Sequence, residues 1–149
     1  MDKRKYEYLR RLAALKDATD DNFDKTVFDI LCRAYQAFLL GKRADKFVSK
    51  EELLKTLSNL GLLTSRTPGK LPDDRKLRNT CRSLLKKGYP IMATSTSAGY
   101  FIAESIEEVQ KPMNENHKRA IEILAAERGY KRSMQFMLGQ LQIGGESNG

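Results

Sequence analysis

The segment "DRKLRNTCRSLLKKGYP", residues 74–90, has the side chains best suited to bind another molecule. At about 100° per residue, a helix here would place an apolar set on one side: Leu77, Cys81, Leu84 and Leu85. A polar set would lie opposite, flanked by Arg78: Arg75, Asn79, Arg82 and Lys86. The body of the segment has no acidic residue to offset its cations, and like charges four residues apart repel each other. The pattern therefore indicates a polyanion as partner, with an ordinary solvated basic helix as the alternative.

The types of side chain on the polar side suit particular groups of a nucleic acid. Arg can bind the major-groove edge of guanine through two hydrogen bonds, and Asn can do the same with adenine. Ser95, Thr96 and Ser97, which follow the segment, are small donors suited to phosphate oxygens, although they are equally common in turns.

Composition agrees with a polyanion partner. The chain has 149 residues, with 27 Lys and Arg against 19 Asp and Glu, and a formal net charge of +8. This balance favours nucleic acid first and an anionic membrane surface second. No apolar run of about 18 residues is present, and the charged N-terminus is unlike a secretory signal, so we expect a cytoplasmic protein.

Residues for catalysis or metal binding are few. His117 is the only histidine, and the acidic group Asp20, Asp21 and Asp24 fits a linker better than a cation site. The stretch "TPGK" (67–70) lacks the first glycine and the final Ser/Thr of a phosphate-binding loop. We therefore expect no enzyme activity, no metal and no cofactor. Cys32 and Cys81 are expected to be buried free thiols.

Apolar spacing predicts the elements that would position the basic helix. Helices are expected over residues 5–17, over 25–40 with Asp24 as N-cap, and over 50–60 after the capping box "SKEE", in which Ser49 and Glu52 would bind each other's amides. A short strand is expected at "KFV" (46–48), and two strands at "IMAT" (91–94) and "GYFIA" (99–103). The stretch "LLTSRTPGKLPD" (62–73) is expected to be a loop.

The C-terminal third is expected to be helical. A second capping box, "SIEE" (105–108), would begin a helix that Pro112 either kinks or ends. Further helix is predicted over 113–128, then an amphipathic piece with Met134, Met137 and Leu138. That stripe fits a dimer seam, a docking site for another protein, or packing on the chain's own core.

The order of these elements, with the stretch "DDRKLRNTCRSLLKKGYPIMATSTSAGYFIAES" (73–105), resembles the winged helix-turn-helix DNA-binding domains over about residues 24–104. The stretch is more closely similar to a group of small phage and prophage winged-helix proteins. Their pattern is a "DRKLR" helix, a Gly-x-Pro-Ile exit, and a Ser-rich wing that ends in Gly-Tyr. The loop from Gly61 to Pro72 is much longer than the tight turn of a simple helix-turn-helix.

The resemblance implies a mainly α fold with a small β-hairpin and extra helices at both ends. It divides the chain into a basic helix with an acidic linker (1–23), a winged-helix domain (24–104), a helical extension (105–142) and a disordered tail (143–149). Helix 74–87 would enter the major groove of double-stranded DNA, with the wing (91–103) beside it. Base edges would be contacted by Arg78, Asn79 and Arg82, and phosphates by Lys70, Arg75, Lys76, Lys86, Thr96 and Ser97.

Biologically, such a protein would be a phage-type regulator or a replication-associated factor. Many proteins of this kind form homodimers, and here the terminal helices are the expected place. The alternative is a winged helix that acts as an adaptor, docking on a phage or host replication or transcription enzyme.

Overall fold

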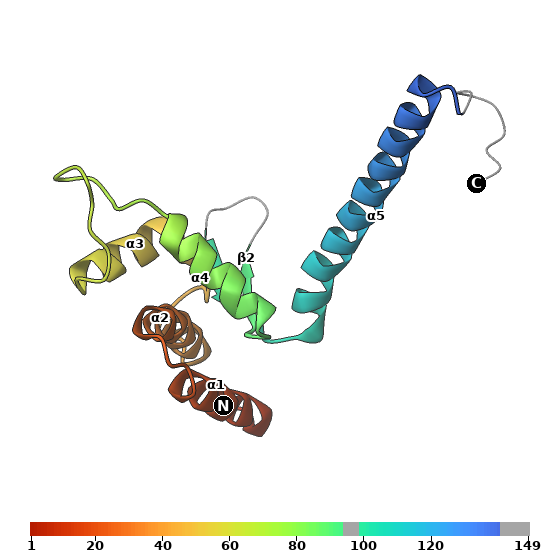
Figure 1. Cartoon of the computed structure of the whole chain (residues 1–149). Helices are drawn as coiled ribbons and strands as arrows, with labels where there is room; N and C mark the ends of the chain where they lie inside the picture. The colour runs from red at the N-terminus through yellow and green to blue at the C-terminus, as the bar shows by residue number, and fades with distance from the viewer. Residues whose placement is uncertain (94–98, 141–149) are drawn as a thin grey trace. The chain divides into compact units, whose positions relative to one another are not determined.

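The computed structural model describes residues 1–93 and 99–140. The chain divides into two compact units, Met1–Ser105 and Ile106–Gly149. The described residues contain five α-helices and one three-stranded antiparallel sheet, so the protein is mainly α (Figure 1). The predicted class, helices with a small β-hairpin, is confirmed at this level.

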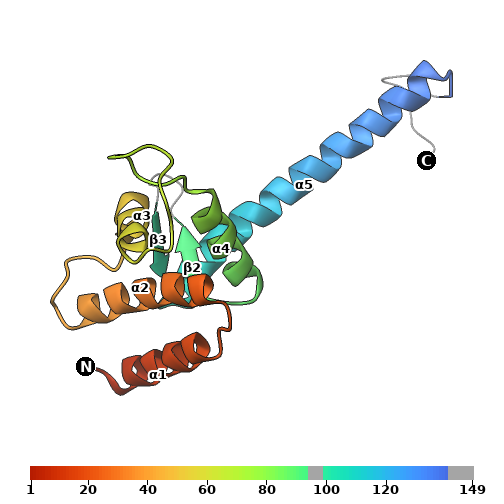
Figure 2. The ribbon, with the colours of Figure 1, turned by 60° about the vertical axis from the view of Figure 1, so that its left-hand side comes forward.

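The helices of the first unit are α1 (Lys3–Asp17), α2 (Asn22–Leu39), α3 (Lys50–Asn59) and α4 (Arg75–Lys86). α1 lies alongside α2 in both ribbon views (Figures 1 and 2) and contributes Leu12 to the core. The Tyr8 hydroxyl donates a hydrogen bond to the Ala103 carbonyl, and the hydroxyls of Thr19 and Tyr89 lie 2.6 Å apart. α1 is thus built into this unit, whereas the sequence placed a domain boundary after residue 23.

The sheet joins segments from both ends of the helical region. Its strands are β1 (Val48–Ser49), β2 (Ile91–Ala93) and β3 (Gly99–Ile102), in the spatial order β1-β3-β2. Val48 pairs with Tyr100, and Ile91 pairs with Ile102. The strands predicted at 91–94 and 99–103 are confirmed as β2 and β3, whereas the strand expected at 46–48 lies later in the chain and shares only Val48 with β1. The connection at 94–98, with Thr96 and Ser97, lies outside the described residues.

α2 is the centre of the core, because it contacts α1, α3, α4 and β3. Its buried side chains follow the predicted helical spacing and meet apolar side chains from every other element of the unit. The largest fully buried side chains are Tyr35, Phe28, Leu31, Leu53, Leu57, Leu77, Leu84, Ile91 and Ile102. This cluster fixes α4 over the start of α2 and beside β2.

Helix ends differ from the sequence expectation in two places. α2 begins earlier, with Asp21 as N-cap: its carboxylate accepts a hydrogen bond from the Asp24 amide at 2.9 Å. Asp24, the predicted cap, instead accepts a hydrogen bond from Thr80 on α4 at 3.2 Å. Ser49 caps α3 as predicted, but the Glu52 carboxylate binds Arg43. Asp24 and Glu52 were each predicted to bind an amide at the start of their own helix, and each instead binds a residue of another segment.

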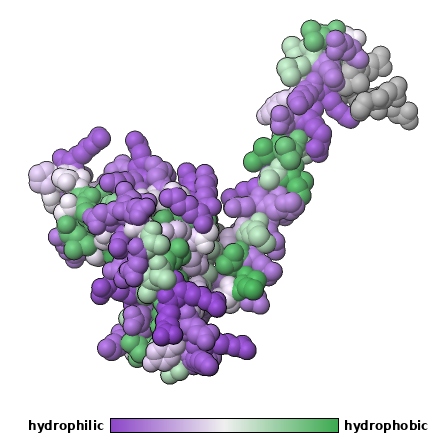
Figure 3. Space-filling view, turned by 60° about the horizontal axis from the view of Figure 1, so that its bottom comes forward, coloured by the Kyte–Doolittle hydropathy of each residue, from purple (hydrophilic) through white to green (hydrophobic). Residues whose placement is uncertain are grey.

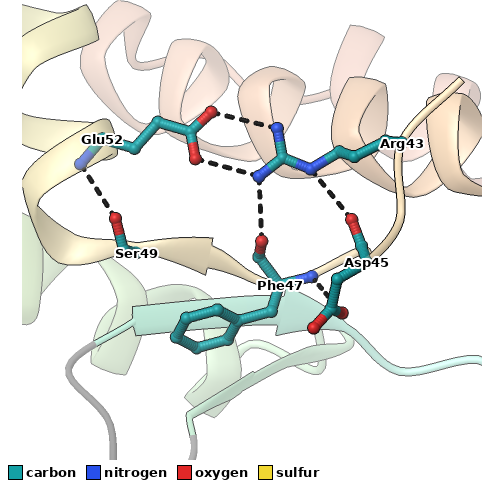
Figure 4. A network of polar contacts seen from close by, with 5 residues as sticks. All are labelled: Arg43, Asp45, Phe47, Ser49 and Glu52. Atoms are coloured by element: carbon teal, nitrogen blue, oxygen red, sulfur yellow. Dashed lines mark hydrogen bonds and ion pairs between the residues drawn. The ribbon is translucent and has the colours of Figure 1, made fainter.

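Arg43 organises the connection between α2 and α3 (Figure 4). Its guanidinium donates two hydrogen bonds to the Glu52 carboxylate, at 3.0 and 2.9 Å, and others to the carbonyls of Asp45 and Phe47. The hydrogen bond and charge of Arg43 hold the pKa of the Glu52 carboxyl below its usual range, against the opposing effect of burial. This two-point pair fixes the segment that carries β1 into the sheet.

We predict that Arg43→Ala lowers the free energy of unfolding by about 1–2 kcal/mol at pH 7, because it removes a two-point charged pair and two carbonyl contacts. The folded pKa of Glu52 is lowered, so its contribution is present above the unfolded pKa and is lost as pH falls through the folded pKa. In urea unfolding, the difference in stability between wild type and variant should therefore shrink in acid to the part that the two carbonyl contacts contribute. Arg33→Ala, which removes an exposed pair to Asp29, is the control and should cost about 0.5 kcal/mol or less. A loss no larger for Arg43→Ala than for Arg33→Ala would contradict the assignment.

Gly99 lies where β3 passes β1. A Cβ atom built on Gly99 would lie 2.2 Å from Cζ of Phe47 and 2.5 Å from the carbonyl oxygen of Val48. The second atom belongs to the backbone of the paired strand, so it cannot turn aside as a side chain can. The absence of a side chain at Gly99 is what allows the β1–β3 pairing.

We predict that Gly99→Ala destabilises the protein by about 2 kcal/mol, because the two strands must separate to admit one methyl group. Thermal unfolding of Gly129→Ala is the matched control. Gly129 lies inside a helix with no atom within 4 Å of an added Cβ, so this change should be neutral or stabilising. Equal melting temperatures for the two variants would contradict this account of the sheet.

The described part of the second unit is one helix, α5 (Ile106–Met137), of 32 residues. Pro112 lies inside it, and the helix continues without interruption. The separate pieces predicted before and after residue 113 are therefore one element. The expected tail, residues 143–149, lies outside the described residues.

Candidate nucleic-acid interface

The two sides of α4 differ as the sequence predicted, with one exception. Leu77, Thr80, Cys81 and Leu84 are buried, whereas Leu85, which was placed on the buried side, is 44% exposed. Leu85 lies at the edge of the helix that faces β2, where the short strand does not cover it. The exposed polar residues of α4 are Arg75, Lys76, Arg78, Asn79, Arg82 and Lys86, and we call them the basic face.

Acidic side chains occur at the start of α4. The Asp73 carboxylate accepts a hydrogen bond from the Arg75 amide at 2.7 Å. The Asp74 carboxylate lies 3.2 Å from Nζ of Lys50 on α3 and 3.2 Å from Nε of Arg78. Burial alone would raise the pKa of the Asp74 carboxyl, but the hydrogen bonds and charges of Lys50 and Arg78 outweigh it and lower the pKa. Asp74 thus links α3 to α4 and holds part of the Arg78 guanidinium.

Lys76, predicted to bind phosphate, has a contact within the protein. Its Nζ lies 4.3 Å from the centre of the Phe23 ring at the start of α2. A cation over an aromatic face is attracted by the negative charge of the ring face. Lys76 is therefore held at the edge of the basic face that is closest to α2.

The 63–73 segment and the first half of α4 line an open cleft of about 880 Å³. Lys70 lines this cleft with Arg75, Lys76 and Asn79, so the structure brings four of the predicted contact residues together. Arg66 also lines it, and sequence reasoning did not select it. The available signal was a cation in a loop that precedes a basic helix, which is too weak to separate Arg66 from other exposed arginines.

A shallower depression continues along the second half of α4. Its lining residues are Asn79, Arg82, Ser83, Lys86 and Lys87. Asn79 and Ser83 line both the cleft and this depression, so the two form one continuous surface. Among the described residues, Arg75, Arg82 and Lys86 form no ion pair. Their positive charge is therefore available to a ligand.

The opposite flank of α4 faces the sheet. Arg78 and Arg82 line a groove there with Leu85, Ile91, Ala93 and Tyr100. Tyr100 packs against the core, and burial raises the pKa of its hydroxyl to about 12. Tyr100 thus anchors β3 to α4, and Arg82 is the one residue of the basic face that lines both this groove and the shallow depression.

Residues 1–93 and 99–140 contain no group of three or more His, Cys, Asp or Glu side chains placed to hold a metal ion. None of the helices described there is long and apolar enough to cross a membrane.

The chain matches no family model, no curated protein sequence and no solved structure. The function is therefore argued from the geometry and charge of this surface alone.

The two thiols of the chain, Cys81 on α4 and Cys32 on α2, are expected to react slowly in the native protein. Burial, and to a smaller degree Asp24, raise the pKa of the Cys81 thiol to about 12, and burial with Asp29 does the same for Cys32. Relative to an ordinary thiol, this lowers the reactive thiolate fraction at pH 8 by roughly a thousandfold. We expect Ellman's reagent to modify neither thiol readily in the native protein and both rapidly in urea. Rapid native modification of Cys81 would mean that α4 is not packed on the core as described.

Proposed function

We propose that this protein binds double-stranded DNA, with α4 inserted in the major groove as the recognition helix of a winged helix-turn-helix. The observation that carries the proposal is the basic face of α4, where Arg75, Arg82 and Lys86 lie exposed and without an acidic partner among the described residues. Like charges so close together repel each other, and a polyanion offsets that repulsion.

The connectivity of the first unit supports the winged-helix part of the proposal. Along the chain, α2, β1, α3, α4, β2 and β3 follow the order of a winged helix, with the middle strand of the sheet contributed last. β2 packs beside α4, and Ala93, its last residue, lines a groove with Arg78 and Arg82, so the hairpin strands lie next to the helix that would enter the groove. The connection from α3 to α4 departs from the tight turn of a simple helix-turn-helix, because residues 60–74 form a long loop.

The dimensions of α4 suit a major groove. Twelve residues give a length of about 18 Å, and a helix with its side chains is about 10–12 Å wide, close to the width of the groove. Asn79 and Arg82, in the middle of the basic face, are the residues best placed to contact base edges. Arg78 shares its guanidinium with Asp74, so its contact with a base competes with that pair.

Phosphate contacts are assigned to the borders of the surface. Lys70 and Arg75 line the cleft at one end, and Lys86 lines the depression at the other. Arg66 joins this set because it lines the same cleft as Lys70. A duplex whose backbones follow these borders would bring its groove over Asn79 and Arg82.

We predict that Arg82→Ala/Lys86→Ala weakens binding to a random duplex about 10- to 100-fold at low salt. It should also reduce the slope of log K against log salt concentration by about 0.9, since Lys86 is the phosphate contact that it removes and each such contact contributes about 0.9. Fluorescence anisotropy over a salt series measures both quantities. The matched control is Lys111→Ala/Lys118→Ala, which removes the same charge from exposed positions of α5.

A smaller loss for the α4 variant than for the α5 variant would overturn the assignment to α4. If the wild-type protein bound no duplex even at low salt, the proposal of DNA binding would fail. The adaptor function, in which the same surface meets an acidic protein, would then be the remaining candidate.

A further inference from the structure

α5 carries many apolar side chains and buries none of them. No residue of Ile106–Met137 is buried, and large apolar side chains are exposed throughout, such as Ile123 at 67% and Met137 at 83%. Hydrophobic patches recur along this helix in the space-filling view (Figure 3). Most of the stability of a helix in a protein comes from packing of an apolar face, so such a helix needs a partner surface.

Seven of the ten large exposed apolar residues of α5 follow a seven-residue repeat, and Ile121, Leu124 and Phe136 lie outside it. One set of positions consists of Ile106, Met113, Ala120, Glu127 and Met134, and a second set, three residues later, consists of Val109, Asn116, Ile123, Tyr130 and Met137. Only Asn116 and Glu127 in these sets are polar. The helix contains about four and a half such repeats, and three to four are enough to indicate a coiled coil.

We propose that α5 forms an antiparallel two-stranded coiled coil with α5 of a second copy of this chain. When the two helices overlap over their full length in opposite directions, Ile106 faces Met137 of the second copy, Val109 faces Met134, and Met113 faces Tyr130. Ala120 and Ile123 meet at the centre. Each of these layers is apolar on both sides, so the dimer buries the apolar residues of both sets along the helix; we call these two sets the stripe.

The two polar positions determine the direction. In the antiparallel arrangement, Asn116 faces Glu127 of the second copy, and its amide can donate a hydrogen bond to that carboxylate. In a parallel, in-register arrangement, Glu127 would face Glu127 of the second copy, which places two like charges at a buried position. One polar pair that is satisfied in only one arrangement is a known way to specify the orientation of coiled coils.

This inference goes beyond the proposed DNA binding and does not rest on it. The stripe belongs to α5, whereas the basic face belongs to α4, and the two lie in separate compact units. A dimer that binds no DNA would leave this inference intact, and a monomer that binds DNA would overturn this inference alone.

The first test is the mass of the full chain. Sedimentation equilibrium over a range of concentrations should show a species of twice the 17.0 kDa chain mass. Ile123→Asp, which places a charge at the centre of the seam, should raise the dimer dissociation constant by about a hundredfold or more. The matched control is Ala125→Asp, which places the same charge on the side of α5 away from the stripe and should leave the constant within a few-fold of wild type.

The second test is the direction of the pair. Val109→Cys and Met134→Cys variants, mixed and oxidised, should give the mixed disulfide in preference to either homodimeric disulfide, with wild type as the control for Cys32 and Cys81. Preferential 109–109 and 134–134 disulfides would overturn the antiparallel arrangement. A monomeric wild type, or equal weakening by Ile123→Asp and Ala125→Asp, would overturn the proposal as a whole, and the former would point to α5 docking on its own chain or on another protein.

Discussion

The first unit depends above all on the packing of one side of α4 against α2 and β2. Leu77 and Leu84 are fully buried in this contact, with Cys81 between them. Because those side chains face the core, the Arg and Lys side chains of α4 face the solvent. The charged residues exposed on the polar side of the helix are therefore all positive. The chemistry of the outer face is thus a consequence of apolar burial on the inner face.

A small number of ionic contacts then hold neighbouring segments to this arrangement. Arg43 and Glu52 fix the passage from α2 through β1 to α3. Asp74 connects α3 to the start of α4 through Lys50, and Asp24 accepts a hydrogen bond from Thr80. Each contact has one partner in the first turn of a helix or just before it, so together they set the angles between helices that their apolar faces alone would leave loosely defined.

The sequence pattern predicted most of the helices and strands, but it did not predict the contacts between residues that are distant in sequence. Apolar spacing predicted α2, α3 and α4 and their burial, and Gly41 and Gly61 take the positive φ expected of helix-ending glycines. It missed the role of Arg43, the incorporation of α1 into the core and the exposure of Leu85, since each depends on residues distant in sequence. Pro112 was expected to kink or end its helix, and it lies inside α5, which continues past it because a proline removes one hydrogen bond of the helix and adds a local clash. For the candidate site, the polar side of α4 and the contribution of Lys70 were predicted, but the ion pair of Arg78 and the approach of Arg66 were not.

The two carboxylates at the start of α4 have a consequence for any phosphate that approaches. A helix N-terminus normally attracts anions, because its free amides and dipole are positive there. Asp73 occupies one of those amides, and Asp74 adds a second negative charge close by. A phosphate that approaches this end therefore meets Lys70 and Arg75 beside two carboxylates, so the attraction of the helix amides and dipole is reduced there and the side-chain cations must supply it.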